Sequence, residues 1–143
     1  VLPSGFSTTI TEIWAPGGQP VDEAFASMAV SVELADEIDI VITREYALTG
    51  QWDRLHDEIA AMRAACGPAH MKAILATGEL GTLTNVYAAS MVAMQAGADF
   101  IKTSTGKEAV NATLPVALTM IRAIQIRAPT RCRMRLLGTS KMK

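Results

Sequence analysis

Hydrophobic positions along the chain change period repeatedly, and this predicts strands that alternate with helices. Residues 37–42 carry an isoleucine at every second position, which is typical of a strand with one apolar face. Residues 52–66 place apolar side chains at steps of three and four, which predicts an amphipathic helix. Further strands are expected at residues 71–76 and 99–103, and further helices at about 21–35, 83–97 and 113–126. Short connections between such elements predict an α/β fold with a parallel sheet.

The two ends of the chain have weaker patterns. Residues 1–6 could end a strand, and residues 8–20 are expected to form a loop. After Arg127, basic residues interrupt the hydrophobic pattern and leave a strand there no apolar face. We therefore expect a folded domain over residues 1–126 and a divergent basic tail over residues 127–143, disordered or loosely attached.

Charge is unevenly placed, although the net charge is only −1. Residues 1–121 hold all 14 acids and 6 of the 13 bases, whereas residues 122–143 hold the other 7 bases and no acid. A basic tail can indicate nucleic acid or an anionic surface as a partner. The alternative is a divergent chain end, which we favour, and we expect no nucleic-acid partner.

Cysteine content and hydropathy bear on the compartment. Two cysteines, Cys66 and Cys132, are too few for a disulfide framework and fit a reducing compartment. No apolar run approaches the roughly 18 residues of a membrane span. The first residues lack the basic start and long apolar stretch of a signal peptide. We expect a cytoplasmic protein without a membrane partner.

Lys102 is the most reactive candidate in the sequence, at the end of the predicted strand 99–103. Active sites of α/β proteins gather at this end of the strands. Burial disfavours a charged ammonium, so a lysine held in an apolar strand is expected to be a nucleophilic amine. The alternative is a lysine whose stem lies along the strand while its ammonium reaches solvent.

The strand at residues 37–42 carries a second candidate group. Glu37 and Asp39 share the face opposite the isoleucines, so both carboxylates are expected to point away from the helices. Two acids on an inward face are unusual, and the alternative is a solvated edge strand.

Three motifs together resemble the deoxyribose-phosphate aldolase family. They are Ala-Asp-Glu-Ile-Asp at Ala35–Asp39, Thr-Gly-Glu-Leu at Thr77–Leu80, and the 17-residue run Gly97–Thr113, in the family's order and spacing. The resemblance is clear over Val21–Ile124. It implies a class I, Schiff-base aldolase on a (β/α)8 barrel. Because 143 residues are fewer than the roughly 200 of a full barrel, the expected fold is a partial TIM barrel of about four βα units.

The resemblance also implies roles for individual residues. Lys102 matches the lysine that forms the Schiff base, and Asp39 matches an aspartate that relays protons. Lys72 matches an inward lysine near the substrate, whose positive charge would disfavour protonation of Lys102. Gly106 and Lys107 match part of the rim that binds the substrate phosphate. The family chemistry implies no metal and no cofactor.

Two hypotheses remain open at this stage. The first is an aldolase that reversibly cleaves 2-deoxy-D-ribose 5-phosphate to D-glyceraldehyde 3-phosphate and acetaldehyde. The second is a catalytically incompetent fragment, because the family's Phe-Lys-Pro-Ala-Gly-Gly motif and its Gly-Ser-Ser phosphate loop do not occur here. Ala76 and Thr43 also replace a usual glutamate and asparagine. In either case, the open edges of a partial sheet would favour self-association.

Overall fold

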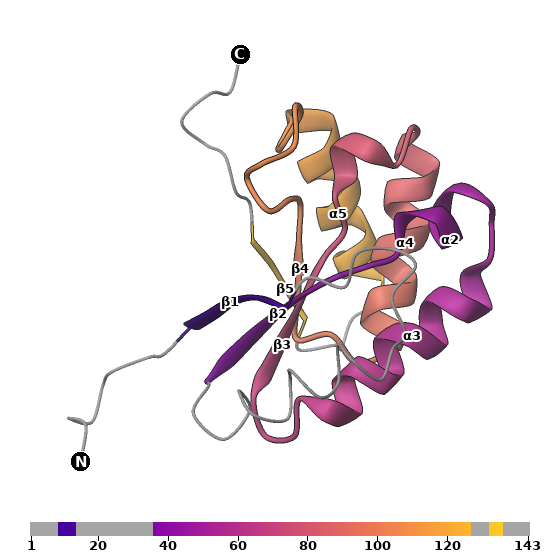
Figure 1. The fold of residues 1–143 in the computed structure, drawn as a ribbon. Coiled ribbons are helices and arrows are strands. Elements are labelled where there is room, and N and C mark those ends of the chain that lie inside the picture. The colour runs from indigo at the N-terminus through magenta and orange to yellow at the C-terminus, as the bar shows by residue number, and fades with distance from the viewer. Residues whose placement is uncertain (1–8, 14–35, 127–131, 136–143) are drawn as a thin grey trace.

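Five parallel strands form one sheet in the computed structural model, which describes residues 9–13, 36–126 and 132–135. The strands follow one another across the sheet in chain order (Figure 1). Each pairs in parallel with the next, as expected when helices connect successive strands. Their bounds are β1 Thr9–Ile13, β2 Glu37–Val41, β3 His70–Ile74, β4 Phe100–Lys102 and β5 Arg133–Arg135.

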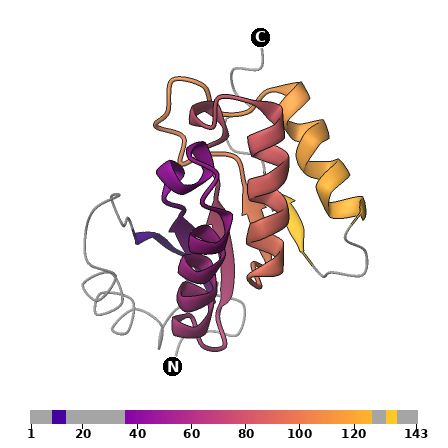
Figure 2. The ribbon, with the colours of Figure 1, turned by 90° about the vertical axis from the view of Figure 1, so that its right-hand side faces the viewer.

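The helices of the described chain lie together on one side of this sheet. In Figure 2, α3, α4 and α5 lie side by side in chain order, with the sheet behind them. No described helix is long and apolar enough to cross a membrane. The helical bounds are α2 Arg44–Leu48, α3 Trp52–Ala65, α4 Leu83–Gln95 and α5 Leu114–Ile126, with a 3-10 turn, η1, at Thr77–Glu79. The predicted alternation of strands and helices is confirmed over residues 37–126.

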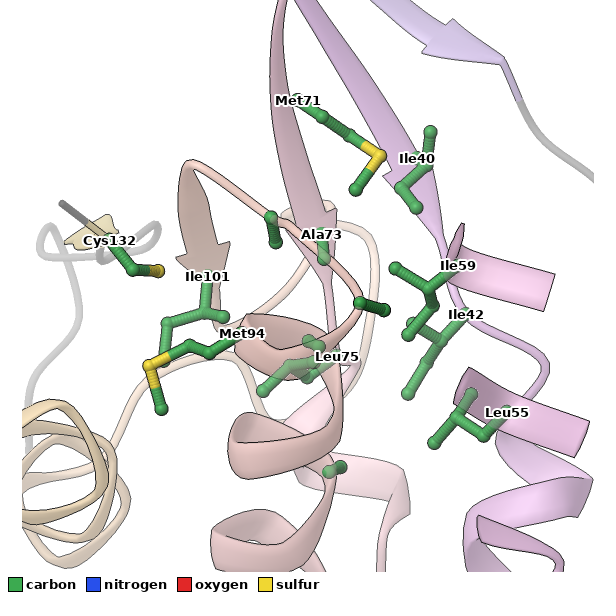
Figure 3. Packing of buried hydrophobic residues seen from close by; sticks show 14 of the residues in the cluster. Ile40, Ile42, Leu55, Ile59, Met71, Ala73, Leu75, Met94, Ile101 and Cys132 are labelled. Atoms are coloured by element: carbon green, nitrogen blue, oxygen red, sulfur yellow. The ribbon is translucent and has the colours of Figure 1, made fainter. Parts of the chain in front are cut away.

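The hydrophobic core lies between the sheet and these helices. Ile40 of β2, Ala73 of β3 and Ile101 of β4 are buried on the helix-facing side (Figure 3). Leu55 and Ile59 of α3 meet them from the helical layer. Because side chains alternate along a strand, packing this face commits the intervening residues of each strand to the opposite face.

Both chain ends differ from the sequence-based expectation. β1 lies in the segment predicted to be a loop and pairs with β2. β5 lies in the predicted tail, where Arg133 N donates to Asp99 O at 2.9 Å. Cys132 is buried and Met134 packs against the core, so apolar contacts accompany the backbone pairing of this short strand with β4. The expectation of disorder was therefore wrong at 132–135. The predicted strand 1–6, the helix 21–35 and the rest of the tail lie outside the described residues.

The face that α5 buries does not carry its largest apolar side chains. Leu114, Leu118 and Ile121 are exposed. The buried residues of this helix are instead Val116, Ala117, Met120 and Ala123. Small alanines let α5 lie close to its neighbours, and a pattern that weights large apolar residues overlooks that solution.

Ile59→Ala tests the packing between α3 and the sheet. Ile59 is fully buried, so truncation removes apolar burial and leaves a cavity. We expect the free energy of unfolding to fall by about 2–5 kcal/mol, measured by urea denaturation. The matched control is Leu118→Ala on the exposed side of α5, which should change stability by less than about 1 kcal/mol. Equal losses of unfolding free energy in the two variants would contradict the packing of α3 against the sheet.

Cys132 tests whether β5 is docked. Burial, reinforced by the negative charge of Asp99, raises the pKa of the Cys132 thiol to about 11, and a backbone hydrogen bond with Ile101 offsets this only in part. At pH 8 the reactive thiolate should be roughly a hundredfold scarcer than in the unfolded chain. Alkylation followed by peptide mapping should therefore label Cys132 slowly in the native protein and rapidly in urea. Rapid alkylation of Cys132 in the native protein would show that β5 is not docked against β4.

Candidate active site

The parallel register brings three charged side chains onto the sheet face away from the helices. Asp39 on β2 is paired with Lys72 on β3, and Ile74, two residues further along β3, is paired with Lys102 on β4. Since paired residues of neighbouring strands share a face, Asp39, Lys72 and Lys102 lie on the same side. Ile38, Ile40 and Ile42 belong to the core on the other side, which confirms the predicted division of β2.

These side chains form a chain of ionic contacts with Glu37. Lys102 Nζ donates a hydrogen bond to Asp39 Oδ2 at 2.6 Å. Asp39 Oδ1 lies 3.5 Å from Lys72 Nζ and accepts no hydrogen bond within the described residues. Lys72 Nζ also pairs with Glu37 Oε2. Asp39 thus lies between two ammonium groups and links strands two places apart in the sheet.

Burial makes this cluster costly unless its charges balance. Lys72 is 1% exposed and Asp39 2%, while Lys102 is 5% exposed and the side chain of Glu37 is 19% exposed. An isolated ion at such depth would cost several kcal/mol in lost hydration. Two cations and two anions leave no net charge when all four groups are ionised. The arrangement can therefore keep a lysine buried in a water-poor site.

The Lys102–Asp39 contact has a direct chemical consequence. An ammonium cannot attack a carbonyl group, so Lys102 must lose a proton before it acts as a nucleophile. Asp39 Oδ2 is within the distance at which a carboxylate exchanges a proton with an amine. An amine and a carboxylate that can exchange a proton are thus adjacent.

Two loops meet at the carboxyl ends of β3 and β4. Thr77 N donates to Thr103 O at 2.8 Å, and Thr77 Oγ1 donates to Asn111 O at 3.3 Å. A Cβ placed on Gly78 would lie 2.1 Å from Val110 O, so only glycine permits this close approach of two backbones. The turn after β3 and the loop after β4 therefore form one packed rim next to Lys102.

Glu108 organises the loop that follows β4. Its carboxylate accepts hydrogen bonds from Thr105 N, Thr105 Oγ1 and Gly106 N at 3.0–3.2 Å. Partial burial raises the pKa of Glu108, but these hydrogen bonds outweigh it, so the net pKa lies below the usual value. Gly106 has φ +94°, a backbone conformation that favours glycine. The loop thus directs two backbone N–H groups at the carboxylate of Glu108.

The structure brings together three of the five candidate site residues: Lys102, Asp39 and Lys72. Gly106 and Lys107 lie on the exposed loop beyond the strand. The pairing of Glu37 with Lys72 and the role of Glu108 in the loop were not predicted from the sequence. Glu37 had been placed on the inward face, but its pairing with Lys72 depends on a neighbouring strand. Glu108 gave no signal, because its contacts follow from the loop conformation rather than from any periodic pattern.

Comparisons with known proteins match most of this chain to one family. A family model described as DeoC/LacD family aldolase matches residues 11–131, a wider range than Val21–Ile124. Human deoxyribose-phosphate aldolase is 71% identical over 91 residues, which cover 64% of this chain and 29% of the human protein. The chain therefore spans less than a third of that relative.

Solved structures share the fold. A crystal structure from Coccidioides immitis has a TM-score of 0.78 at 25% identity and covers 90% of this chain and 49% of that one. The deoxyribose phosphate aldolase of Aeropyrum pernix, described as tetrameric, has a TM-score of 0.70 at 20% identity and covers 87% and 51%. The described α/β sheet is thus a partial TIM barrel, as the sequence predicted.

A double-mutant cycle tests the buried charge balance. Asp39→Asn leaves two lysines facing one carboxylate, and we expect it to lower the free energy of unfolding by about 3–5 kcal/mol. Adding Lys102→Met removes the uncompensated cation, so the double variant should be more stable than Asp39→Asn alone, with a coupling of about 1–3 kcal/mol. Asp57→Asn, on the exposed side of α3, is the control. Additive losses would show that Asp39 and Lys102 do not interact.

Proposed function

Because the chain belongs to the DeoC/LacD family of aldolases, we propose that it acts on 2-deoxy-D-ribose 5-phosphate through a Schiff base on Lys102. The reaction is the reversible cleavage to D-glyceraldehyde 3-phosphate and acetaldehyde. The observation that carries this proposal is the 2.6 Å contact between Lys102 Nζ and Asp39 Oδ2 on the buried face of the sheet. A sugar-phosphate substrate fits a cytoplasmic location.

The first step is formation of the imine. Asp39 takes a proton from Lys102 Nζ, and the resulting amine attacks the aldehyde carbon C1 of the open-chain sugar. Asp39 then returns the proton to the carbinolamine oxygen, which leaves as water. Lys72 Nζ pairs with Glu37 Oε2 and lies 3.5 Å from Asp39 Oδ1, where an ammonium would be an electrostatic partner for the carboxylate between transfers.

The second step breaks the C2–C3 bond. The protonated imine accepts the bonding electrons and becomes an enamine, while the C3 hydroxyl loses its proton and becomes the aldehyde of glyceraldehyde 3-phosphate. Protonation of the enamine at C2 and addition of water to the imine then release acetaldehyde and restore Lys102. Proton transfer is needed at each stage, and Asp39 is the relay that the geometry offers.

The phosphate end of the substrate is assigned to the loop after β4. Gly106 N–H and the exposed Lys107 would meet the phosphate as a hydrogen-bond donor and a cation. The resemblance gives further proton and phosphate contacts to motifs that this sequence does not contain. We therefore propose imine formation, rather than rapid turnover, as the activity of this chain by itself.

Reductive trapping tests the proposal. Acetaldehyde followed by borohydride should ethylate Lys102 faster than Lys107, because the Asp39 relay assists dehydration only at Lys102. Peptide mapping by mass spectrometry reads both sites in one sample. Asp39→Asn should slow labelling at Lys102 by roughly tenfold to a hundredfold and leave Lys107 unchanged.

The controls separate chemistry from unfolding. Asp57→Asn should label like the parent chain, and urea should abolish the preference for Lys102. Equal labelling of Lys102 and Lys107 in the native protein would mean that the sheet does not activate this amine. That result would support the second hypothesis, a catalytically incompetent fragment.

A further inference from the structure

The anion-binding loop after β4 is occupied by the chain's own carboxylate. Glu108 Oε2 accepts hydrogen bonds from Thr105 N, Thr105 Oγ1 and Gly106 N. Thr105 N also donates to the other carboxylate oxygen, Glu108 Oε1. Gly106 N is the donor that the proposed function assigns to the substrate phosphate. An N–H group that already donates to a carboxylate is not available to a phosphate oxygen at the same distance.

The loop is open to solvent beside this contact. A Cβ built on Gly106 would meet no atom within 4 Å, so the space beside this residue is open. Gly106 and Lys107 are exposed, whereas Glu108 is half-buried. The loop is also anchored without the side chain of Glu108, because Asn111 Nδ2 donates to the backbone oxygen of Glu108 and Thr77 Oγ1 donates to Asn111 O. The side chain can therefore leave without detaching the loop from the rim.

We propose that Glu108 is an internal competitor for the phosphate site, displaced when a phosphate dianion binds to Thr105 and Gly106. This inference rests on the proposed function and adds the residue that sets anion selectivity. A phosphate carries more charge and more acceptor oxygens than one carboxylate, so it can replace the internal ligand. A weakly charged or neutral group cannot replace this carboxylate. Unphosphorylated sugars would therefore leave Glu108 hydrogen-bonded to Thr105 and Gly106.

The test measures binding of inorganic phosphate to the whole chain at neutral pH. Amide NMR shifts of Thr105 and Gly106 report binding, and the side-chain carboxyl shift of Glu108 reports its displacement. Glu108→Gln keeps an acceptor oxygen of the same shape but loses the negative charge. Without that competitor, phosphate should bind about fivefold more tightly or better.

Glu45→Gln is the matched control, because it removes the same charge from an exposed position on α2. It should leave phosphate affinity within about twofold of the parent. Unchanged or weaker binding in Glu108→Gln would overturn the inference, as would phosphate binding that leaves the Glu108 carboxyl signal in place. Absence of phosphate binding in every variant would overturn it too.

The outcome is separable from that of the proposed function. Acetaldehyde carries no phosphate, so trapping at Lys102 reads the lysine chemistry without using the loop. If Lys102 is trapped selectively but Glu108→Gln does not change phosphate binding, only the proposed role of Glu108 is overturned. If Glu108→Gln strengthens phosphate binding but Lys102 is not trapped selectively, only the aldolase proposal is overturned.

Discussion

The hydrogen bond between Lys102 and Asp39 places the strictest demand on the rest of the structure. It joins β4 to β2 across β3, so it exists only when three strands hold their parallel register. A slip of one residue in any of them would turn a charged side chain into the apolar core. The isoleucines of β2 that pack against α3 therefore also fix the side on which Asp39 lies. Core packing and site geometry both follow from the alternation of side chains between the two faces of the strands.

Much of this arrangement is predictable because it depends on local pattern. The alternation over residues 37–42 is enough to separate Asp39 from the isoleucines, and the run around Lys102 identifies the strand end. The missed features depend on contacts far apart in the chain. β5 pairs with β4 and brings only Cys132 and Met134 to the core, and so small an apolar surface is hard to recognise in an Arg-rich segment. α5 buries alanines because of how closely its neighbours approach, which periodicity does not encode.

The rim beside Lys102 is held by backbone contacts and by an internal carboxylate. Gly78 lets the turn after β3 contact Val110 directly, and Thr77 adds hydrogen bonds to the same loop. Glu108 then satisfies the N–H groups of Thr105 and Gly106 from within. An internal anion of this kind keeps the donors oriented, because unsatisfied N–H groups would otherwise draw the loop toward other partners. Lys102 and the loop after β4 are thus held by separate contacts on adjoining segments.

Side-chain NMR of 15N-labelled lysine tests the central claim most directly. The account predicts that the ammonium protons of Lys102 and Lys72 exchange with water far more slowly than those of the exposed Lys107, because both groups are buried against carboxylates. It also predicts a coupling across the hydrogen bond from Lys102 Nζ to the carboxyl carbon of Asp39. Ammonium protons of Lys102 that exchange as fast as those of Lys107, with no such coupling, would contradict the buried pair.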